Sequence, residues 1–282
     1  MSDSESYTVA EPFGLLNVFK PAGWTSRDVV NRVQRMLKPL KVGHAGTLDP
    51  LAEGVLVVCV GAATRLVEFV QRQRKEYAAT YLLGRESNTE DTDGEIRFLP
   101  DPPVPTRESV EEAARLFVGD IMQRPPAFSA IKVGGKRAYD LARRGEEVEL
   151  EPRKITVYRL EIEDYRYPEL KLRMACSSGT YVRSIGRDLA IHLGTAAVTS
   201  VLVREAVGAF RLTEAVRLEQ VDRAALLSHL KPAVEAVVDL PRIELSPDQI
   251  ARVLRGQAVR LPPDAFGEEL AAVDECGRLV SI

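Results

Sequence analysis

Short apolar runs separated by glycine and proline mark the first part of the chain. Residues 15–20 are mostly apolar and precede a Pro-Ala-Gly turn at 21–23, which predicts a strand that ends in a turn. A Thr-Ser pair at 25–26 can cap a helix that continues to about residue 36. Residues 55–60 are apolar and rich in β-branched side chains, so they predict a buried strand.

The remaining pattern mixes helices and strands without a regular strand–helix–strand repeat. Polar residues 84–94 predict a long exposed loop. Further helices are predicted over residues 63–71, 107–118, 137–144, 182–193 and 247–255, and further strands over 77–83, 155–167, 170–176 and 197–203, with an apolar alternation at 270–280. The expected fold class is therefore α+β.

Composition restricts the class of protein. The chain has 282 residues, 45% of them hydrophobic and 28% charged, which is typical of a folded globular protein. The longest apolar run, residues 55–63, is about half of what a membrane-spanning helix needs. The three cysteines and three histidines are widely scattered, which predicts no disulfide set, no metal site and a reducing, cytoplasmic location.

The net charge of −3 is unevenly distributed. Residues 14–48 and residues 124–144 each carry six basic side chains against one acid. Two such stretches in an acidic protein can form a groove for a polyanion, although ordinary solvated helix faces explain them equally well.

The segment 43–54, GHAGTLDPLAEG, is a glycine-rich loop that contains a candidate catalytic acid, Asp49. Pro50 biases Asp49 to an extended backbone, and the glycines permit close approach of a ligand. An Asp-Pro pair in such a loop is also an ordinary turn, so the residues alone leave both interpretations open. The sequence GHAG matches the GxxG of KH domains, but the surrounding pattern does not.

A second segment, residues 176–189, runs from a strand end through a glycine turn into a helix. Tyr181 and Arg183 lie in its first turn, where a tyrosine can stack on a base and an arginine can pair with a carboxylate or a phosphate. A core tyrosine and a surface arginine are the ordinary alternative. Tyr77 begins a predicted strand, where an aromatic side chain ordinarily packs in the core. The acids of residues 90–93 lack the spacing of a calcium-binding loop.

Taken together, these segments resemble the tRNA pseudouridine-55 synthase family of the bacterial TruB type. The matching pieces are LLNVFKPAGWTSRDVVNRVQRML, KVGHAGTLDPLAEGVLVVCVGAATRL, KEYAATYLLGRESNTEDTDGEI, QRPPAFSAIKVGGKRAYDLARRG and CSSGTYVRSIGRDLAIHLGTAAVTSVLVREAVGAF. The resemblance implies a mixed β-sheet core flanked by helices. It also implies a catalytic domain over 14–240 with an RNA-contacting insertion at 124–152, and an abbreviated C-terminal PUA-like β lobe over 243–282. Residues 1–13 are acidic and lack the basic and apolar regions of a secretory signal, so their composition predicts a disordered leader.

The same resemblance implies an isomerase that flips the T-loop uridine 55 of tRNA out of its stack and converts it to pseudouridine. The C1′–N1 bond breaks, the uracil turns, and a C1′–C5 bond forms, with no cofactor and no metal. Asp49 matches the catalytic aspartate, which can act as a nucleophile at C1′ or as a base at C2′.

The resemblance also assigns supporting roles in substrate binding. Arg183 holds Asp49 ionised, Tyr77 stacks on the uracil, and Tyr181 and Leu202 complete the pocket wall. The remaining matched residues are His44 as a brace for the gap that the flipped base leaves, Lys20 as a support for the first motif or the RNA backbone, and Asp91 as the acid of the third segment.

The expected partner is the T-arm of tRNA, bound by a monomer without a protein partner or a membrane. A tRNA-folding chaperone is an alternative or additional function. A nucleosidase that uses Asp49 and Asp91 as a carboxylate pair is a further alternative, which the basic stretches disfavour.

Overall fold

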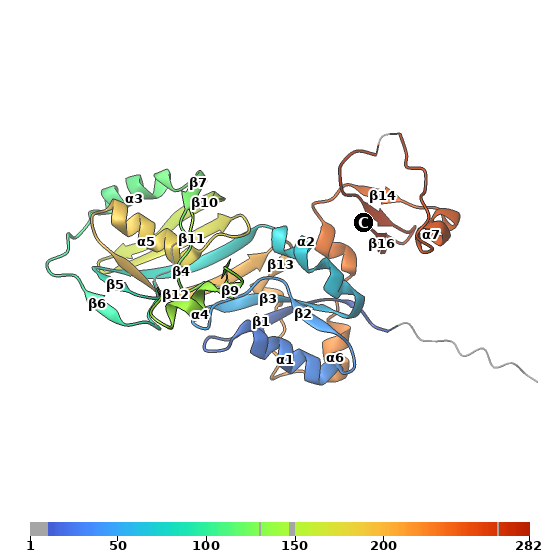
Figure 1. Ribbon diagram of the computed structural model, residues 1–282, viewed down its shortest axis with the longest axis horizontal. Coiled ribbons are helices and arrows are strands. Elements are labelled where there is room, and N and C mark those ends of the chain that lie inside the picture. Colours follow the sequence, from blue (N-terminus) through green and yellow to red (C-terminus); the bar gives the residue numbers. More distant parts are fainter. Residues whose placement is uncertain (1–10, 130, 147–149, 264) are drawn as a thin grey trace, which may run out of the picture.

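A nine-stranded sheet forms the body of the molecule (Figure 1). The computed structural model describes residues 11–129, 131–146, 150–263 and 265–282. The strands of the sheet are β1 (Gly14–Lys20), β2 (Val42–His44), β3 (Glu53–Val60), β4 (Lys75–Leu83), β7 (Gly119–Gln123), β10 (Arg153–Arg166), β11 (Glu169–Cys176), β12 (Ala197–Val207) and β13 (Phe210–Arg211). Their order is β1-β3-β12-β4-β11-β10-β7, with β2 beside β3 and β13 beside β12. Within this sheet β3 and β12 pair in parallel and the other described pairs are antiparallel, so the sheet is mixed and the α+β prediction is confirmed.

Strand β3 is apolar at successive positions because both of its faces are covered. Leu56 and Val58 pack with residues of α1 (Ser26–Leu37) and α6 (Arg223–Ser228). On the opposite face, Val55 and Val57 pack with residues of α2 (Val67–Arg72) and of the 3-10 turns η1 (Gly61–Leu66) and η3 (Ala233–Val237). A strand buried on both sides has no polar face, which explains the continuous run in the sequence.

Helix α1 begins where the sequence predicts. The Thr25 side chain accepts a hydrogen bond from the Asp28 backbone N–H, and the Asp28 carboxylate accepts one from the Thr25 N–H at 2.9 Å. This capping box satisfies two of the backbone donors that a helix start leaves unpaired. The predicted helix over 63–71 is different in detail, because it opens with η1 and becomes α-helical only in α2.

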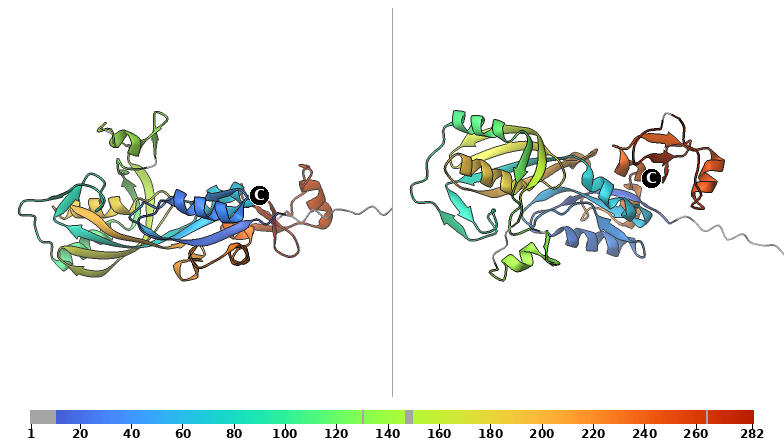
Figure 2. Two further views of the ribbon diagram at one scale, coloured as in Figure 1. Left: turned by 90° about the horizontal axis from the view of Figure 1, so that it is seen from below. Right: turned by 45° about the horizontal axis from the view of Figure 1, so that its top comes forward.

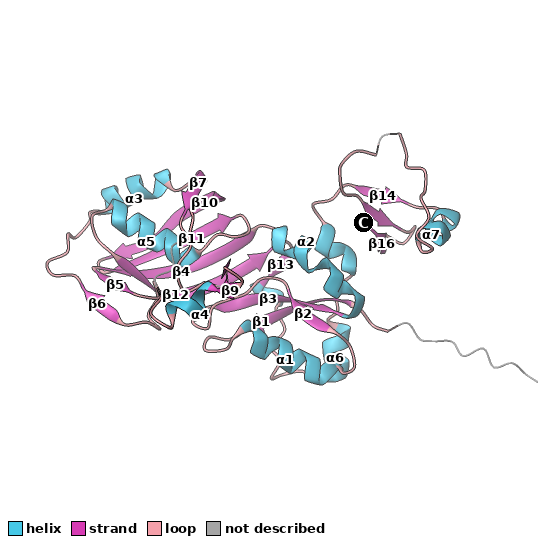
Figure 3. Cartoon of the chain, viewed as in Figure 1, coloured by secondary structure: helices cyan, strands magenta, loops and turns pink. Residues whose placement is uncertain are grey.

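Strand β4 alternates buried and half-buried positions along its length. Its buried face carries Lys75, Tyr77 and Tyr81, and most of this face is covered by α3 (Arg107–Leu116) and α5 (Val182–His192), as Figure 3 shows. The Tyr81 hydroxyl donates to the Val182 carbonyl at 2.8 Å and so fixes the start of α5 on the sheet. This is the element that carries Arg183.

The segment between β7 and β10 stands out from the sheet (Figure 2). It contains the short strands β8 (Lys132–Val133) and β9 (Lys136–Arg137), followed by α4 (Ala138–Ala142). The predicted insertion over 124–152 includes positions 130 and 147–149, which lie outside the described residues.

Two sequence predictions are wrong. The segment 84–94 is not an exposed loop, because β5 (Arg85–Ser87) pairs with β6 (Ile96–Phe98) and Asp91 is buried and bridges Thr199. The acids in this segment are buried against arginines of α5, a contact that local polarity does not reveal. Strand β7 was also missed, because its pairing partner β10 lies about thirty residues further along the chain.

Residues after β13 end in a small lobe at one end of the molecule (Figure 1). It consists of β14 (Arg242–Glu244), β15 (Ala271–Val273), β16 (Leu279–Ser281) and α7 (Pro247–Val253), whose start is capped by Ser246 as predicted. Ala271 and Leu279 pack into the same core as η3. Among the described residues, no helix has both the length and the apolar character needed to cross a membrane.

Candidate active site

A cleft of about 1090 Å³ opens beside β4 and β12. Its walls come from the β2–β3 loop, the N-terminus of α5, the 88–93 segment and the insertion. The structure brings seven of the eight predicted site residues into this cleft, namely His44, Asp49, Tyr77, Asp91, Tyr181, Arg183 and Leu202. These residues come from separate stretches of the sequence, which the sheet order brings together.

Asp49 and Arg183 form an ion pair at the centre of the cleft. The Arg183 Nε lies 2.9 Å from the Asp49 Oδ2. The Arg183 side chain is 4% exposed, whereas that of Asp49 is 36% exposed. The cation is therefore buried behind the carboxylate, and the carboxylate itself remains accessible to a ligand.

Arg183 is held by contacts with two further segments. Its Nη1 lies 3.3 Å from the Asp91 Oδ2 and also donates to the Thr89 carbonyl, while its Nη2 donates to the Phe128 carbonyl at 2.9 Å. A guanidinium with so many fixed partners has little freedom to turn, so it positions Asp49 rigidly.

Asp91 is fully engaged by its neighbours. Its carboxylate accepts hydrogen bonds from the Thr89 hydroxyl at 2.5 Å and from the Asp93 N–H at 3.1 Å, besides its ion pair with Arg183. The side chain is buried. Asp91 therefore supports Arg183 and is not placed as a second carboxylate for the nucleosidase alternative.

The backbone around Asp49 is anchored from beneath. The Ser26 hydroxyl accepts a hydrogen bond from the Leu48 N–H at 2.8 Å and donates to the Leu48 carbonyl at 3.2 Å. Lys20 donates to the carbonyls of Trp24 at 2.5 Å and Pro50 at 3.3 Å, on either side of the loop entry. Both anchors hold the loop, so the carboxylate is preorganised.

The burial of Lys20 favours one of the two roles that the resemblance left open, support of the first motif, over support of the RNA backbone. The side chain is 0% exposed and does not line the cleft. Burial is the main reason that its pKa falls to about 8, although the charge of Asp49 opposes the fall. Its hydrogen bonds to the carbonyls of Trp24 and Pro50 agree with support of the first motif.

Tyr77 lies on the floor of the cleft, on the buried face of β4. Burial raises the pKa of its hydroxyl, so it stays protonated at neutral pH. His44 lines the cleft from β2, and burial together with the charges of Arg27 and Arg204 lowers the pKa of its imidazole. The aromatic ring and the neutral imidazole suit contacts with a nucleobase rather than with phosphates.

Comparison with known proteins shows which family the chain belongs to. The family model described as TruB family pseudouridylate synthase (N terminal domain) matches residues 34–182. The chain is 44% identical to the tRNA pseudouridine synthase B of Symbiobacterium thermophilum over 261 residues, which are 92% of this chain and 87% of that protein. The protein belongs to the TruB family of pseudouridylate synthases.

Other relatives agree with this membership. The tRNA pseudouridine synthase B of Ruegeria pomeroyi is 43% identical over 276 residues, covering 95% of this chain and 90% of that protein. A chain in the crystal structure of a Cbf5-Nop10-Gar1 complex superposes with a TM-score of 0.75 at 25% identity, covering 95% of this chain and 77% of that chain. The shared fold confirms the predicted mixed-sheet core of a pseudouridine synthase.

In this TruB-family chain, sequence reasoning missed Arg204. It is 2% exposed, follows Leu202 on the same face of β12, and lies opposite Tyr77 of β4. Its Nε donates to the Val55 carbonyl at 2.7 Å, and its guanidinium also donates to the carbonyls of Gly46 and Thr47. A lone arginine on the buried face of an apolar strand is the signal that could have found it.

Gln123 was also missed. This buried side chain accepts a hydrogen bond from the Tyr181 N–H at 2.8 Å and donates to the Tyr181 carbonyl at 3.0 Å. The Arg153 guanidinium lies 4.9 Å from the centre of the Tyr181 ring. The backbone and the ring of Tyr181 are therefore both fixed at the cleft wall of the TruB-family site.

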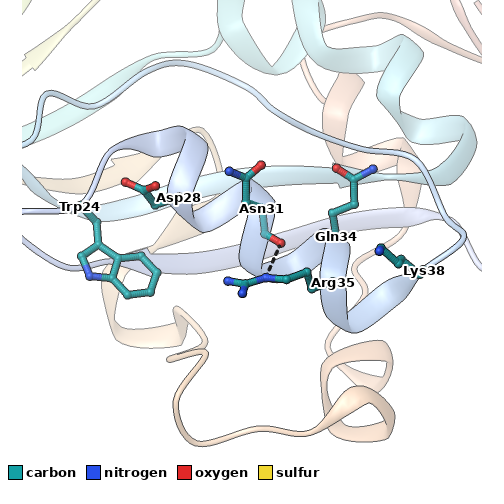
Figure 4. A pocket seen from close by; sticks show the side chains of 6 residues that line it. All are labelled: Trp24, Asp28, Asn31, Gln34, Arg35 and Lys38. Carbon is teal, nitrogen blue, oxygen red and sulfur yellow. Dashed lines mark hydrogen bonds between the residues drawn. The ribbon is translucent and has the colours of Figure 1, made fainter.

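A second hollow lies along α1 (Figure 4). Its lining residues are Trp24, Asp28, Asn31, Gln34, Arg35 and Lys38. The carboxylate of Asp28 caps the helix, and Arg35 donates to the Asn31 carbonyl at 3.3 Å. Both side chains form hydrogen bonds with backbone groups at α1 or its N-cap. The catalytic candidates of this TruB-family protein are therefore the residues around Asp49. Within the described part of the chain, His, Cys, Asp and Glu side chains form no cluster that suits a metal ion.

Proposed function

We propose that the protein isomerises uridine 55 in the T loop of tRNA to pseudouridine. One observation carries the proposal: the accessible Asp49 carboxylate, ion-paired to the buried Arg183, opens into a cleft that also contains Tyr77. Relatives at 41–44% identity are named tRNA pseudouridine synthase B, which supports tRNA as the substrate.

In the proposed reaction, the C1′–N1 bond breaks and its electron pair stays on the uracil. Asp49 either attacks C1′ or removes the proton from C2′, and both routes need the ionised carboxylate that the Arg183 charge favours. The uracil then turns and its C5 forms the new bond to C1′, while the Asp49–C1′ bond breaks on the first route or the proton returns to C2′ on the second. The C5 proton leaves to solvent, and N1 takes up a proton. Atoms and electrons balance without a redox partner, and the proposal uses no cofactor and no metal.

The base must leave its stack to reach Asp49. We assign Tyr77 to the face of the flipped uracil, with Tyr181 and Leu202 as the pocket wall. His44 lies at the same cleft and would fill the gap that the base leaves in the loop. The fixed positions of the Tyr181 ring and backbone support a preformed pocket.

The insertion at 124–152 is proposed to contact the T-arm. Tyr139 and Arg143 of this segment line the cleft, and its exposed cations would meet phosphates by shape rather than by sequence. The lobe over 243–282 is proposed to be PUA-like, supported by its small sheet of β14, β15 and β16. We further propose a cytoplasmic monomer that acts without a protein partner.

The test uses unmodified tRNA carrying tritium at uracil C5. Wild type should release tritium and leave a carbodiimide-dependent primer-extension stop at position 55, whereas Asp49→Asn should lose at least about 10³-fold in rate because an amide is neither nucleophile nor base. Conversion by wild type at another position would contradict the site assignment. An Asp49→Asn variant with a rate close to that of wild type would contradict the role of the carboxylate.

A tRNA-folding chaperone is the second candidate function, because the projecting insertion and the basic stretches suit RNA binding without chemistry. The same Asp49→Asn variant separates the two. A variant that still accelerates refolding of misfolded tRNA without tritium release would show that both functions exist on one surface.

A further inference from the structure

Charges on the floor of the cleft do not balance. Arg204, Lys75 and Arg183 are buried cations that line the cleft. The carboxylates at this floor are Asp49 and Asp91, and both pair with Arg183. Three buried cations against these two carboxylates leave a formal surplus of one positive charge in a site that takes up a neutral base.

Arg204 and Lys75 are the cations of this set that reach the cleft without an ion pair to any carboxylate in the described part of the chain. Arg204 donates to the backbone carbonyls of Val55, Gly46 and Thr47. Lys75 donates to the carbonyl of Gln73 at 2.6 Å and to that of Gln71. An unpaired buried charge is costly, and Ser26 anchors the same loop with a neutral hydroxyl. Hydrogen bonding to the backbone therefore does not explain why these two groups are charged.

Their positions place the charge beside Tyr77. Arg204 lies opposite Tyr77 in the β4–β12 pair, and Lys75 precedes it by two residues on the same face of β4. The charge of Arg204 reaches two neighbours in the cleft, since it adds to the effect of burial in lowering the pKa of Lys75 and of His44. Whatever stacks on Tyr77 is exposed to this field.

We infer that Arg204 and Lys75 stabilise the uracil anion that forms when the C1′–N1 bond breaks. The bond's electron pair moves to N1 and spreads onto O2 and O4, so the detached base carries one negative charge beside Tyr77. The surplus positive charge attracts this anion more strongly than the neutral uridine that enters. The site therefore stabilises the charged state more than the bound substrate. The inference rests on the proposed isomerase function and assigns the groups that hold its intermediate.

The experiment compares two substrates under single-turnover conditions at saturating enzyme. T-arm hairpin RNA carries either uridine or 5-fluorouridine at the target position. Loss of the original nucleoside is followed by liquid chromatography and mass spectrometry of digests to nucleosides, because the isomeric product has the same mass and is distinguished by its retention time. Fluorine withdraws electrons and stabilises the departing anion by itself. A variant that lacks anion stabilisation should therefore lose less rate on the fluorinated substrate.

We expect Arg204→Met to lose on the order of 10²-fold in rate on uridine, and at least about ten-fold less on 5-fluorouridine. Lys75→Met should show the same substrate dependence with a smaller loss. Arg204→Lys keeps the charge and should recover part of the rate. Ser26→Ala is the matched control, because it loosens the Asp49 loop without changing charge and should slow both substrates equally.

Equal losses on both substrates for Arg204→Met and Lys75→Met would overturn the inference and leave both residues with a structural role. Thermal melting and hairpin binding identify a variant that fails to fold, and Lys75→Met keeps the test decisive because it leaves the contacts of Arg204 intact. Failure of the proposed function is distinguishable, since wild type would then consume neither substrate.

Discussion

Burial divides the work among the charged residues at the site. Arg183 is almost inaccessible while its partner Asp49 reaches the cleft, which fits the proposed roles of a cation that orients and a carboxylate that reacts. Lys20 is more deeply buried still and contacts only backbone carbonyls around the same loop. A carboxylate fixed in this way needs no reorganisation when substrate arrives.

Lys75 makes stability depend on pH. Burial, helped by the charge of Arg204, lowers its pKa in the folded protein to about 8 from the ordinary 10.5. Between these values the unfolded chain binds more protons than the folded one, so the free energy of unfolding rises with pH through this window. Relative to Lys75→Met, wild type should gain about 2 to 3 kcal/mol between pH 7 and pH 10.

Urea unfolding of both proteins at several pH values measures this difference. Tyrosines, cysteines and Lys20 titrate in both proteins, so their contributions cancel when the two are subtracted. A difference that stays constant with pH would show that Lys75 titrates normally in the folded protein.

Single residues were only partly predictable from the sequence. Asp49 in a glycine-rich loop was compatible with an ordinary turn, and the family resemblance, not its local pattern, singled it out. Arg204 lies in a segment read as a plain apolar strand, and its contacts with Gly46 and Thr47 join residues more than 150 positions apart. Such a partnership has no local signature.

At the scale of elements, the seat of α5 on the sheet depends on Gly186. A Cβ at this position would overlap ring atoms of Tyr81, which is fully buried and hydrogen-bonded to the same helix. Gly186→Ala should destabilise the protein by about 1–3 kcal/mol, although alanine favours helices by about 1 kcal/mol in an open position. It should also slow catalysis, because α5 carries Arg183.

Thermal or urea unfolding checks this prediction, with Ile191→Ala on the exposed side of the same helix as control. The control should change stability by less than about 0.5 kcal/mol. A Gly186→Ala protein as stable as wild type would mean that the ring of Tyr81 can move aside.

Elements with strong local signals were predicted correctly. The capped helices α1 and α7 begin at the expected residues, and β10 and β11 lie where two strands are expected. The failures are β7 and the 84–94 segment, whose structure depends on partners elsewhere in the chain. Local propensity decides an element only where tertiary contacts do not override it.

At the scale of the whole molecule, an acidic protein with net charge −3 has to bind RNA through local cations. Arg143 of the insertion is exposed and lines the cleft. Arg143→Ala should weaken T-arm binding and reduce the slope of log affinity against log salt by about 0.7 to 0.9, the loss of one phosphate contact.

Binding titrations from low to moderate salt measure the slope. Arg166, whose side chain is 88% exposed on β10 and which does not line the cleft, provides the control Arg166→Ala with an unchanged slope. An unchanged slope for Arg143→Ala would mean that this face does not meet the RNA backbone.

The sheet order was beyond prediction from the sequence pattern, because the pattern gives strands but not their neighbours. The parallel contact of β12 with β3 joins the two halves of the sheet and places Leu202 and Arg204 beside Tyr77. The family resemblance implied a mixed-sheet core, but it implied the complete fold and not the individual strand neighbours.

The central place of β12 also has a consequence for synthesis on the ribosome. Strands β3 and β4 are complete by residue 83, but the strand that fits between them arrives only with residues 197–207. Until then the nascent chain presents two open strand edges and lacks one wall of its pocket, and edges of this kind are prone to wrong pairing. We expect the enzyme to stay inert toward RNA until most of the chain has been translated.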